Sequence, residues 1–393
     1  MKKSHKIYAI VASFVVMFIL AVTESIRGIL IPTFKLDFNV TDNQIGTLLL
    51  LATLAYVIGT FLAGQQSKKM NQKQIVIIGM AICAVGFFGT SFAAEFYQLI
   101  MGYIVLTIGI GYVVLGLNTI VPAIKVAYIA IIMNMLHFNY GVGSAITQRV
   151  AGFLITYGVN WRHIFLVFVG MYILGIVLYV FVEQPKKVVV EKHLEKIHDY
   201  EMPLIVLFCV GLGFYISAEV QTLNWFLNYM KEFYGYTAND ASTYVSLFFA
   251  MIAIGRLLGG YILEKIGYLK GVTIAIALAL VVYLTGLMNE GLLILISLSG
   301  LFCSIVYPTT MLIMQRVFEH NAMRVVSIVS MAGSIINMFS GKLIGYLNDT
   351  IGVRLSYFTI PVSLGLCLVC YLIIHFEINK VENKRKELEG VTV

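Results

Sequence analysis

Two charged residues, Glu24 and Arg27, lie three positions apart in the first long apolar segment of this 393-residue chain. Residues at that spacing share one face of a helix, and charges inside an apolar membrane helix usually face a cavity or a partner. The two side chains could form an internal ion pair. Alternatively, Glu24 could bind a proton or a cation, or the two residues together could contact a polar ligand. Arg149, in the fifth apolar segment, is a further basic residue that could pair with Glu24.

The seventh apolar segment carries a stripe of polar side chains. Ser217, Gln221, Asn224 and Asn228 recur at helical spacing, and Trp225 borders them. Amide groups offer the paired donors and acceptors that match hydroxyl groups, and an aromatic ring can cover the apolar face of a sugar. Hydrogen bonding between neighbouring helices is the alternative role. With polar residues of other segments, the predicted substrate-binding set is Asn118, Gln148, Arg149, Gln221, Asn224, Trp225, Asn228 and Tyr307.

We predict roles in coupling and gating for further charged residues. Glu219 lies off the amide stripe and could be a structural acid or a second coupling site, so the predicted coupling set is Glu24, Arg27 and Glu219. Arg256, in the sequence GRLLGG, precedes a turn that contains Glu264 and Lys265. We predict that these last three residues anchor a gate rather than contact a substrate.

The sequence lacks the common enzymatic motifs. It has no G-x-x-x-x-G-K-[ST] phosphate loop, no zinc-protease HExxH and no nucleophile elbow GxSxG. The five cysteines all lie within apolar runs, where we interpret them as small buried hydrophobic residues. We therefore expect no enzymatic activity, no cofactor and no metal site.

The composition indicates that these polar residues lie in membrane helices. Sixty per cent of the residues are hydrophobic, only 12% are charged, and the mean hydropathy is +0.90. Soluble domains carry about 25% charged residues, so the apolar excess must face lipid. At about 20 residues per helix, the chain has room for roughly a dozen spans. Soluble enzymes and nucleic-acid binders are disfavoured, despite a net charge of +7.

The fold class predicted is an all-α membrane protein with twelve transmembrane helices in two six-helix bundles. A polar stretch, EQPKKVVVEKHLEKIHDYE, divides the apolar segments into two sets of six. The predicted domains are an N-terminal bundle (1–182), a cytoplasmic linker (183–201), a C-terminal bundle (202–379) and a cytoplasmic tail (380–393). The twelve predicted spans are 7–33, 43–64, 74–95, 97–122, 126–157, 161–182, 202–229, 241–263, 270–288, 291–315, 323–347 and 354–377.

The distribution of basic residues predicts the orientation. Lysines and arginines gather in the loops on the N-terminal side of the membrane, whereas the opposite side receives only Lys35, Arg162, Lys231 and Arg354. Positive charge marks cytoplasmic loops, so we expect both termini to be cytoplasmic in a multi-pass protein of the cytoplasmic membrane. The basic MKKSHK start precedes a first span that we expect to be retained rather than cleaved.

Several motifs resemble those of the major facilitator superfamily. Gly260, Glu264, Lys265 and Gly267 fit its cytoplasmic G-x-x-x-[D/E]-[K/R]-x-G turn, although the corresponding earlier turn has Lys68 and Asn71 instead of the usual aspartate and glycine. Within the superfamily, the chain is most similar to the fucose–proton symporter family. That similarity is carried by Arg27 with GILIP, Gly111, Asn118-Thr119, Leu136-His137-Phe138, Ala218-Glu219-Val220, Trp225, GRLLGG and Tyr307-Pro308-Thr309.

The resemblance implies a sugar-like substrate bound between two halves and moved by a proton or cation gradient. Gly28 and Val114 stand where family members often have acids, so either Glu24 and Glu219 have taken over coupling or the chain is a uniporter or another kind of carrier. We expect a secondary active transporter of a small polar solute, a sugar or sugar acid, that works by alternating access. The expected partners are this solute, a proton or sodium ion and the lipid bilayer, with no nucleic acid and a monomeric chain.

Two other functions remain open. An efflux carrier (a drug–proton antiporter) for amphipathic compounds would use the 17 methionines and 25 phenylalanines in adaptable apolar pockets. A receptor that binds solute without transporting it would usually need a signalling domain, for which the C-terminal tail offers little room.

Overall fold

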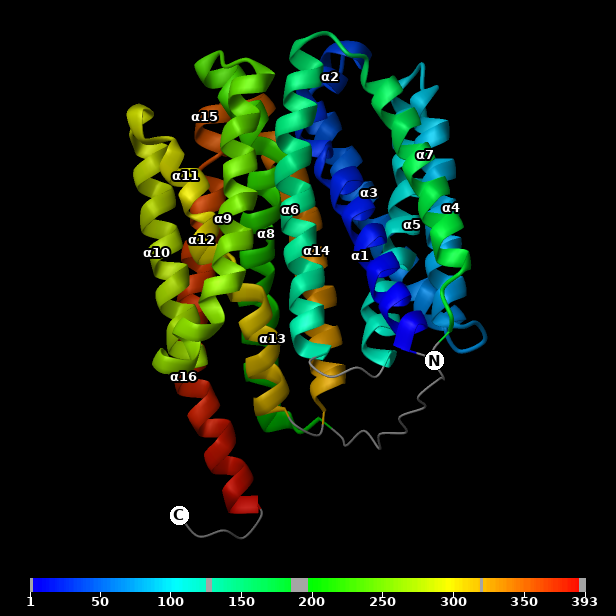
Figure 1. Ribbon diagram of the computed structural model, residues 1–393. Coiled ribbons are helices and arrows are strands. Elements are labelled where there is room, and N and C mark those ends of the chain that lie inside the picture. Colours follow the sequence, from blue (N-terminus) through cyan, green and yellow to red (C-terminus); the bar gives the residue numbers. More distant parts are fainter. Residues whose placement is uncertain (1–2, 125–128, 185–196, 319–320, 389–393) are drawn as a thin grey trace. The chain divides into compact units, whose positions relative to one another are not determined.

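The structure, a computed structural model, describes residues 3–124, 129–184, 197–318 and 321–388 (Figure 1). All regular secondary structure in these ranges is helical. The described chain forms two compact units. The first contains the helices before residue 190 together with Leu223–Phe249 and Lys342–Arg354. The second contains the remaining helical segments, including the C-terminal helix.

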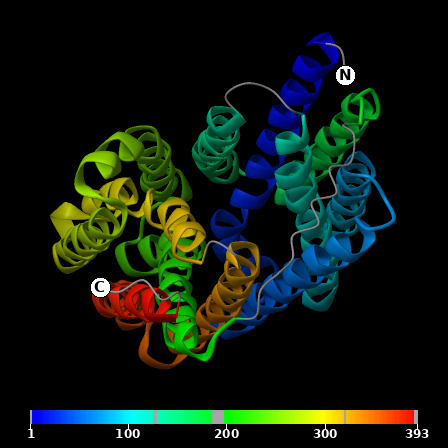
Figure 2. The same cartoon turned by 90° about the horizontal axis from the view of Figure 1, so that it is seen from below.

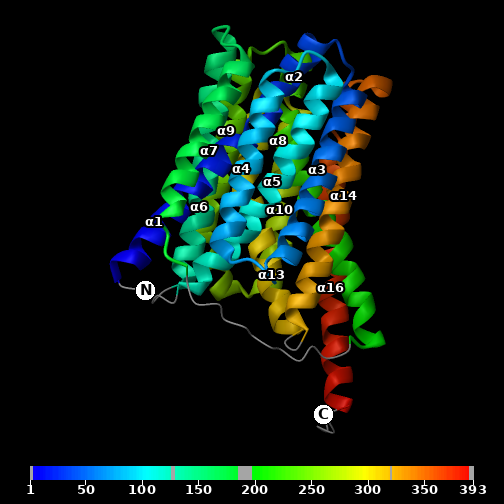
Figure 3. The ribbon, with the colours of Figure 1, turned by 90° about the vertical axis from the view of Figure 1, so that its right-hand side faces the viewer.

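Seven helices precede the predicted linker, and they form most of the first unit. α3, α4, α5 and α7 lie side by side (Figure 3), while α6 packs mainly on α1. The chain enters α1 at the same end of this unit as the connection between α3 and α4 (Figure 1). The helices are α1 (Lys3–Ser25), α2 (Arg27–Phe38), α3 (Asp42–Gln66), α4 (Gln72–Ser91), α5 (Phe96–Ala123), α6 (Ile129–Thr156) and α7 (Trp161–Val180).

The remaining helices follow the linker. In the second unit, α10 packs against α11, α12, α13 and α16, which Figure 2 shows end-on. α8, α9 and α14 contribute residues to both units. The elements are η1 (Asp199–Glu201), α8 (Met202–Tyr234), α9 (Ala238–Ile266), α10 (Tyr268–Met288), η2 (Glu290–Leu292), α11 (Ile294–Leu298), α12 (Gly300–Cys303), α13 (Val306–Val317), α14 (Ala322–Ile351), α15 (Val353–Ser356) and α16 (Thr359–Leu388).

Eleven helical segments of the described chain are long and apolar enough to cross a membrane. The predicted helical membrane class is therefore confirmed. α6 covers the fifth predicted span as a 28-residue helix but is not among the eleven, so the exact number of twelve stays a prediction. Within the predicted linker 183–201, residues 185–196 lie outside the described ranges.

The predicted tail begins as a continuation of the last helix. α16 runs to Leu388, and residues 389–393 lie outside the described ranges. Lys380 forms an ion pair with Glu377, three residues earlier on the same helix. Such pairs support helices at the surface, so the polar residues after 379 extend α16 rather than end it.

Small residues let α4 and α5 approach closely. A Cβ atom added to Gly109 would lie 2.7 Å from the amide nitrogen of Cys83 and 2.7 Å from the carbonyl oxygen of Gly79. Phe87 then packs against Phe165 on α7 with ring centroids 5.1 Å apart. Glycine is required at position 109 because the facing backbone of α4 occupies the space of a side chain.

Replacing Gly109 by alanine is expected to destabilise the protein by about 1–3 kcal/mol, since the methyl group overpacks the contact between α4 and α5. Gly89→Ala is the matched control, because among the described residues nothing lies within 4 Å of its added Cβ. In this control, alanine is expected to favour the helix by about 1 kcal/mol over glycine. Thermal unfolding of both variants in detergent checks this; equal melting temperatures would contradict the close approach.

Candidate functional site

The first apolar segment contains a helix break. α1 ends at Ser25 and α2 begins at Arg27. The amide of Ile29, which would bond to Ser25 in a continuous helix, bonds instead to the carbonyl of Ile26 at 3.1 Å. The Nε2 atom of Gln148 on α6 donates to the released carbonyl oxygen of Ser25 at 2.6 Å. A side-chain amide thus satisfies a backbone group that could not stay unpaired in lipid.

Glu24 and Arg27 bind different neighbours on either side of this break. The hydroxyl of Tyr140 on α6 donates to Oε2 of Glu24 at 2.8 Å. Nε of Arg27 donates to Oδ1 of Asn224 on α8 at 3.2 Å. The ion pairs of the described residues do not include one between Glu24 and Arg27. The structure therefore does not contain the internal ion pair considered from the sequence.

Arg149 does not pair with Glu24 in the described chain, which corrects the pairing considered above. It is exposed, and its Nη1 atom donates to the backbone oxygen of Asn239 at 3.2 Å and also to the side chain of that residue. Consecutive residues of a helix point in different directions. Because Gln148 faces α1, Arg149 on the same helix faces α9.

The predicted amide stripe of α8 is buried and bonded to several helices. Nε2 of Gln221 donates to Oδ1 of Asn337 on α14 at 2.7 Å. Asn224 accepts from Arg27, and Nδ2 of Asn228 donates to Oδ2 of Asp42 on α3 at 3.4 Å. The stripe therefore makes the hydrogen bonds between helices that the sequence left as an alternative, and binding of a substrate stays a prediction.

Three members of the predicted substrate-binding set carry buried atoms without a hydrogen-bond partner among the described residues. They are Oε1 of Gln148, Nε1 of Trp225 and Oδ1 of Asn228, and the three residues are at most 1% exposed. A buried polar atom without a partner costs about 1–3 kcal/mol. These two acceptors and one donor are therefore the atoms of the first unit best able to gain from a polar ligand.

The other predicted site residues lie elsewhere. Asn118 is exposed on α5. In the second unit, Glu219 lies within hydrogen-bonding reach of Tyr215, whose hydroxyl donates to the carbonyl oxygen of Cys303 at 2.6 Å. Glu219 also interacts electrostatically with Tyr307, which is 37% exposed. The second unit thus has its own carboxylate beside tyrosines.

The predicted gating residues flank the turn from α9 to α10. Glu264 and Lys265 are exposed, and Nζ of Lys265 lies 4.2 Å from the ring centre of Tyr261. Gly267 has a φ angle of 92°, which explains the glycine at the end of the motif. Arg256 lies about two helical turns before Glu264, where it is partly buried and near Tyr215. Their role as a gate stays a prediction.

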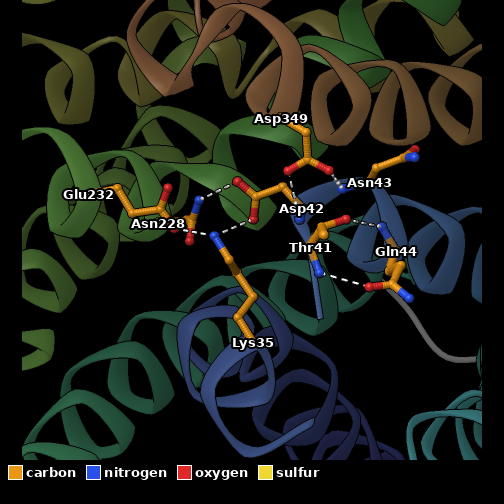
Figure 4. A network of polar contacts seen from close by, with 8 residues as sticks. All are labelled: Lys35, Thr41, Asp42, Asn43, Gln44, Asn228, Glu232 and Asp349. Atoms are coloured by element: carbon orange, nitrogen blue, oxygen red, sulfur yellow. Dashed lines mark hydrogen bonds and ion pairs between the residues drawn. The ribbon is translucent and has the colours of Figure 1, made fainter. Parts of the chain in front are cut away.

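A charged network at the other end of the first unit was not predicted (Figure 4). Nζ of Lys35 lies 2.7 Å from Oδ1 of Asp42, whose side chain is 3% exposed, and Lys35 also pairs with Glu232 on α8. The sequence offered only a weak signal, because Lys35 and Glu232 each lie at a helix end where isolated surface charges are common.

Two residues of α14 complete this network from a distant part of the sequence. The carboxylate of Asp349 accepts from the amides of Asp42 and Asn43, at 3.1 and 2.9 Å, and so caps the start of α3 (Figure 4). Nζ of Lys342 donates to Oγ1 of Thr47 at 2.7 Å. A negative charge is favourable at a helix N-terminus, so Asp349 stabilises both α3 and its contact with α14.

Three glycines allow close helix contacts in the same unit. An added Cβ atom would lie 2.2 Å from the carbonyl oxygen of Leu223 at Gly28, 2.0 Å from Oγ of Ser242 at Gly152, and 2.3 Å from the carbonyl oxygen of Asp42 at Gly345. These positions join α2 to α8, α6 to α9, and α3 to α14. Each contact brings a helix from before the linker against one from after it.

An apolar hollow of about 350 Å³ lies in the first unit between α1, α6 and α7. Its lining includes Phe18, Val22, Ile146 and Met171. Among the described residues, no group of three or more His, Cys, Asp or Glu side chains could hold a metal ion.

Curated relatives are similar to this chain along different lengths. A glucose/galactose transporter of Brucella abortus (strain 2308) is 22% identical over 396 residues, which cover 94% of this chain and 93% of that protein. The multidrug efflux pump SdrM of Staphylococcus aureus (strain N315) is 24% identical over 228 residues. That match covers 57% of this chain and only about half (49%) of the pump.

Solved structures share the fold. A bacterial homologue of the human lysosomal transporter Spinster, in an inward-facing and unoccupied conformation, superposes with a TM-score of 0.80 at 15% identity, covering 97% of this chain and 99% of the other. The E. coli fucose:proton symporter gives a TM-score of 0.64 at 17% identity, with 94% and 99% covered.

The family model of the Major Facilitator Superfamily matches residues 13–218 and 204–391. These two matches together account for nearly the whole chain, in agreement with the resemblance found in its motifs. The expectation of a transporter rather than an enzyme is confirmed by this match and by the structural neighbours. The helices, their break at Ile26 and their glycine contacts thus belong to a transporter of the Major Facilitator Superfamily.

Proposed function

We propose that the chain is a secondary active transporter of a small polar solute that works by alternating access. The observation that carries this proposal is the group of polar residues at the break between α1 and α2. There, Gln148 keeps a buried acceptor without a partner beside an interrupted membrane helix. Transporters of several folds bind their substrates at interrupted helices.

A sugar or sugar acid is the solute class that we propose. A relative that matches 94% of this chain is a glucose/galactose transporter, and two structural neighbours are proton symporters for fucose and D-xylose. Amide oxygens and an indole N–H, such as the unpaired atoms of Gln148, Asn228 and Trp225, match the hydroxyl groups of a sugar. Gln221, Asn118, Arg149 and Tyr307 complete the proposed binding set.

Glu24 is the residue that we propose for coupling to a proton or sodium gradient. Its carboxylate accepts from Tyr140 and is not held by Arg27 or Arg149 in an ion pair. A carboxylate that is not fixed by an arginine is freer to gain and lose a proton. Glu219, beside Tyr215 in the second unit, is the alternative coupling residue.

The charged network of Lys35, Asp42, Glu232 and Asp349 is the gate that we propose at the extracellular side. Positive charge in the loops favours a cytoplasmic start of α1, and α1 with α2 leads from there to Lys35 at the other end. The outer parts of α8 and α14 must then leave these contacts when the protein opens outward. Arg256, Glu264 and Lys265 form the gate that we propose at the cytoplasmic side. Twelve spans, cytoplasmic termini, a cytoplasmic-membrane location and a monomeric state belong to the same proposal.

Efflux of amphipathic compounds is the second candidate. The apolar hollow lined by Phe18 and Met171 has the volume of a small ligand site, and part of the chain is similar to a multidrug efflux pump. Expression in a drug-sensitive host separates the two functions. Raised resistance without uptake of any sugar would favour efflux.

Uptake into proteoliposomes tests the main proposal. We expect a labelled hexose or hexuronate to accumulate when a proton or sodium gradient is imposed. Accumulation that does not respond to either gradient would remove the coupling, and no flux of any polar solute would contradict the transporter function itself.

The variant Glu24→Gln is expected to lose gradient-driven accumulation, because the amide cannot carry a proton, while downhill movement of solute continues. Glu219→Gln serves as the comparison, since only one of the two carboxylates needs to couple. Uptake with and without a gradient measures the effect. Unchanged gradient dependence in Glu24→Gln would exclude this carboxylate as the coupling residue.

Asp349→Ala is expected to speed amide hydrogen exchange about tenfold or more at residues 42 and 43, which lose the acceptor of their hydrogen bonds. Thr350→Ala is the matched control on the same helix, since the Thr350 hydroxyl bonds only to α14. Mass spectrometry of the peptide that contains the start of α3 measures the exchange. Equal rates in the two variants would argue against the proposed gate.

A further inference from the structure

Arg27 is a cation with an incomplete set of partners. Its guanidinium has five N–H donors and carries a positive charge. Among the described residues, Arg27 has one hydrogen-bond partner, the neutral Oδ1 atom of Asn224 on Nε, and it forms no ion pair with a carboxylate. The side chain is only partly exposed. A charge in a membrane helix usually has a counter-charge, and no carboxylate of the described residues supplies one to Arg27 in an ion pair.

The nearest acid in the sequence does not supply that group. Glu24 shares a helix face with Arg27, but it accepts from Tyr140 on α6, whereas Arg27 reaches α8. Gly28 fixes this arrangement, because α2 contacts the backbone of α8 at Leu223, next to Asn224. Asn224 therefore holds Nε, and the two Nη groups keep the planar geometry that binds a carboxylate through two hydrogen bonds.

We propose that the cargo carries a carboxylate, which binds to the two Nη groups of Arg27 while Asn224 holds Nε. This inference rests on the proposed transport of a sugar-sized solute and narrows it to a sugar acid such as a hexuronate. A single positive charge, with the carboxylate of Glu24 three residues away, suits a monoanion better than the dianion of a sugar phosphate.

Matched ligand pairs test the inference on the purified full-length protein in lipid nanodiscs. The pairs are D-glucose with D-glucuronate and D-galactose with D-galacturonate, which differ in one –CH₂OH or –COO⁻ group, and D-glucose 6-phosphate is the dianion. Apparent dissociation constants follow from the rise in melting temperature with ligand concentration. We expect each uronate to bind about tenfold or more tightly than its hexose, as a charge-assisted hydrogen-bond pair would give.

Substitutions of Arg27 test whether this residue causes the preference for uronates over hexoses. Arg27→Gln should reduce the ratio between hexose and uronate dissociation constants to about one. Arg27→Lys should keep part of this ratio, because lysine has the charge but lacks the planar guanidinium group. Arg354→Gln is the control: that arginine is exposed and lies 5.0 Å from the ring centre of Phe233. This variant should keep the full ratio.

Three results would overturn the inference. They are a uronate preference that persists in Arg27→Gln, no preference in the unaltered protein, and tighter binding of the sugar phosphate. If hexoses still bind and are transported, the proposed function survives each of them. Absence of binding and flux for every sugar and sugar acid would instead contradict the proposed function together with the inference.

Discussion

A backbone polar group in the core of a lipid bilayer has no water to bind, so it needs a hydrogen-bond partner within the protein. This constraint explains the arrangement at the start of the chain. The break after Ser25 releases a carbonyl oxygen, and Gln148 reaches across from α6 to bind it. The hydroxyl of Ser25 bonds to Ser144 on the same helix at 2.7 Å. The interruption of α1 is therefore tolerated only because α6 lies against it.

The same constraint gives Glu24 and Arg27 different neighbours. A carboxylate and a guanidinium three residues apart could neutralise each other, which would leave neither for a ligand. Here α6 supplies a hydroxyl to Glu24 and α8 supplies an amide oxygen to Arg27. Both residues are thus bonded to neutral groups, which is the arrangement that the proposed coupling and binding roles require. A transport site needs that property, because tight internal ion pairs would have to break in every cycle.

How much of the structure the sequence predicts depends on how far apart along the chain the interacting residues lie. Hydropathy and loop charges predict the helical membrane class, since these properties accumulate along contiguous residues. The face of a helix is also predictable, as the buried Gln221 and Asn228 of the amide stripe illustrate. The pairing of Arg149 with Glu24 that the sequence allowed is not found, because it depends on which face of α6 meets α1. The pairing of Asp42 with Asp349 joins residues 307 positions apart, and no local pattern indicates it.

Completion of α3 by Asp349 has a consequence for biosynthesis. Thr41 and Gln44 form a local capping box, but the amides of Asp42 and Asn43 find their acceptor only on α14. Ribosomes make the chain from its N-terminus, so the first turn of α3 lacks this acceptor until Asp349, 307 residues after Asp42, has been synthesised. A premature stop before residue 349 would leave an early helix unfinished at its first turn, even though every residue of that helix is present.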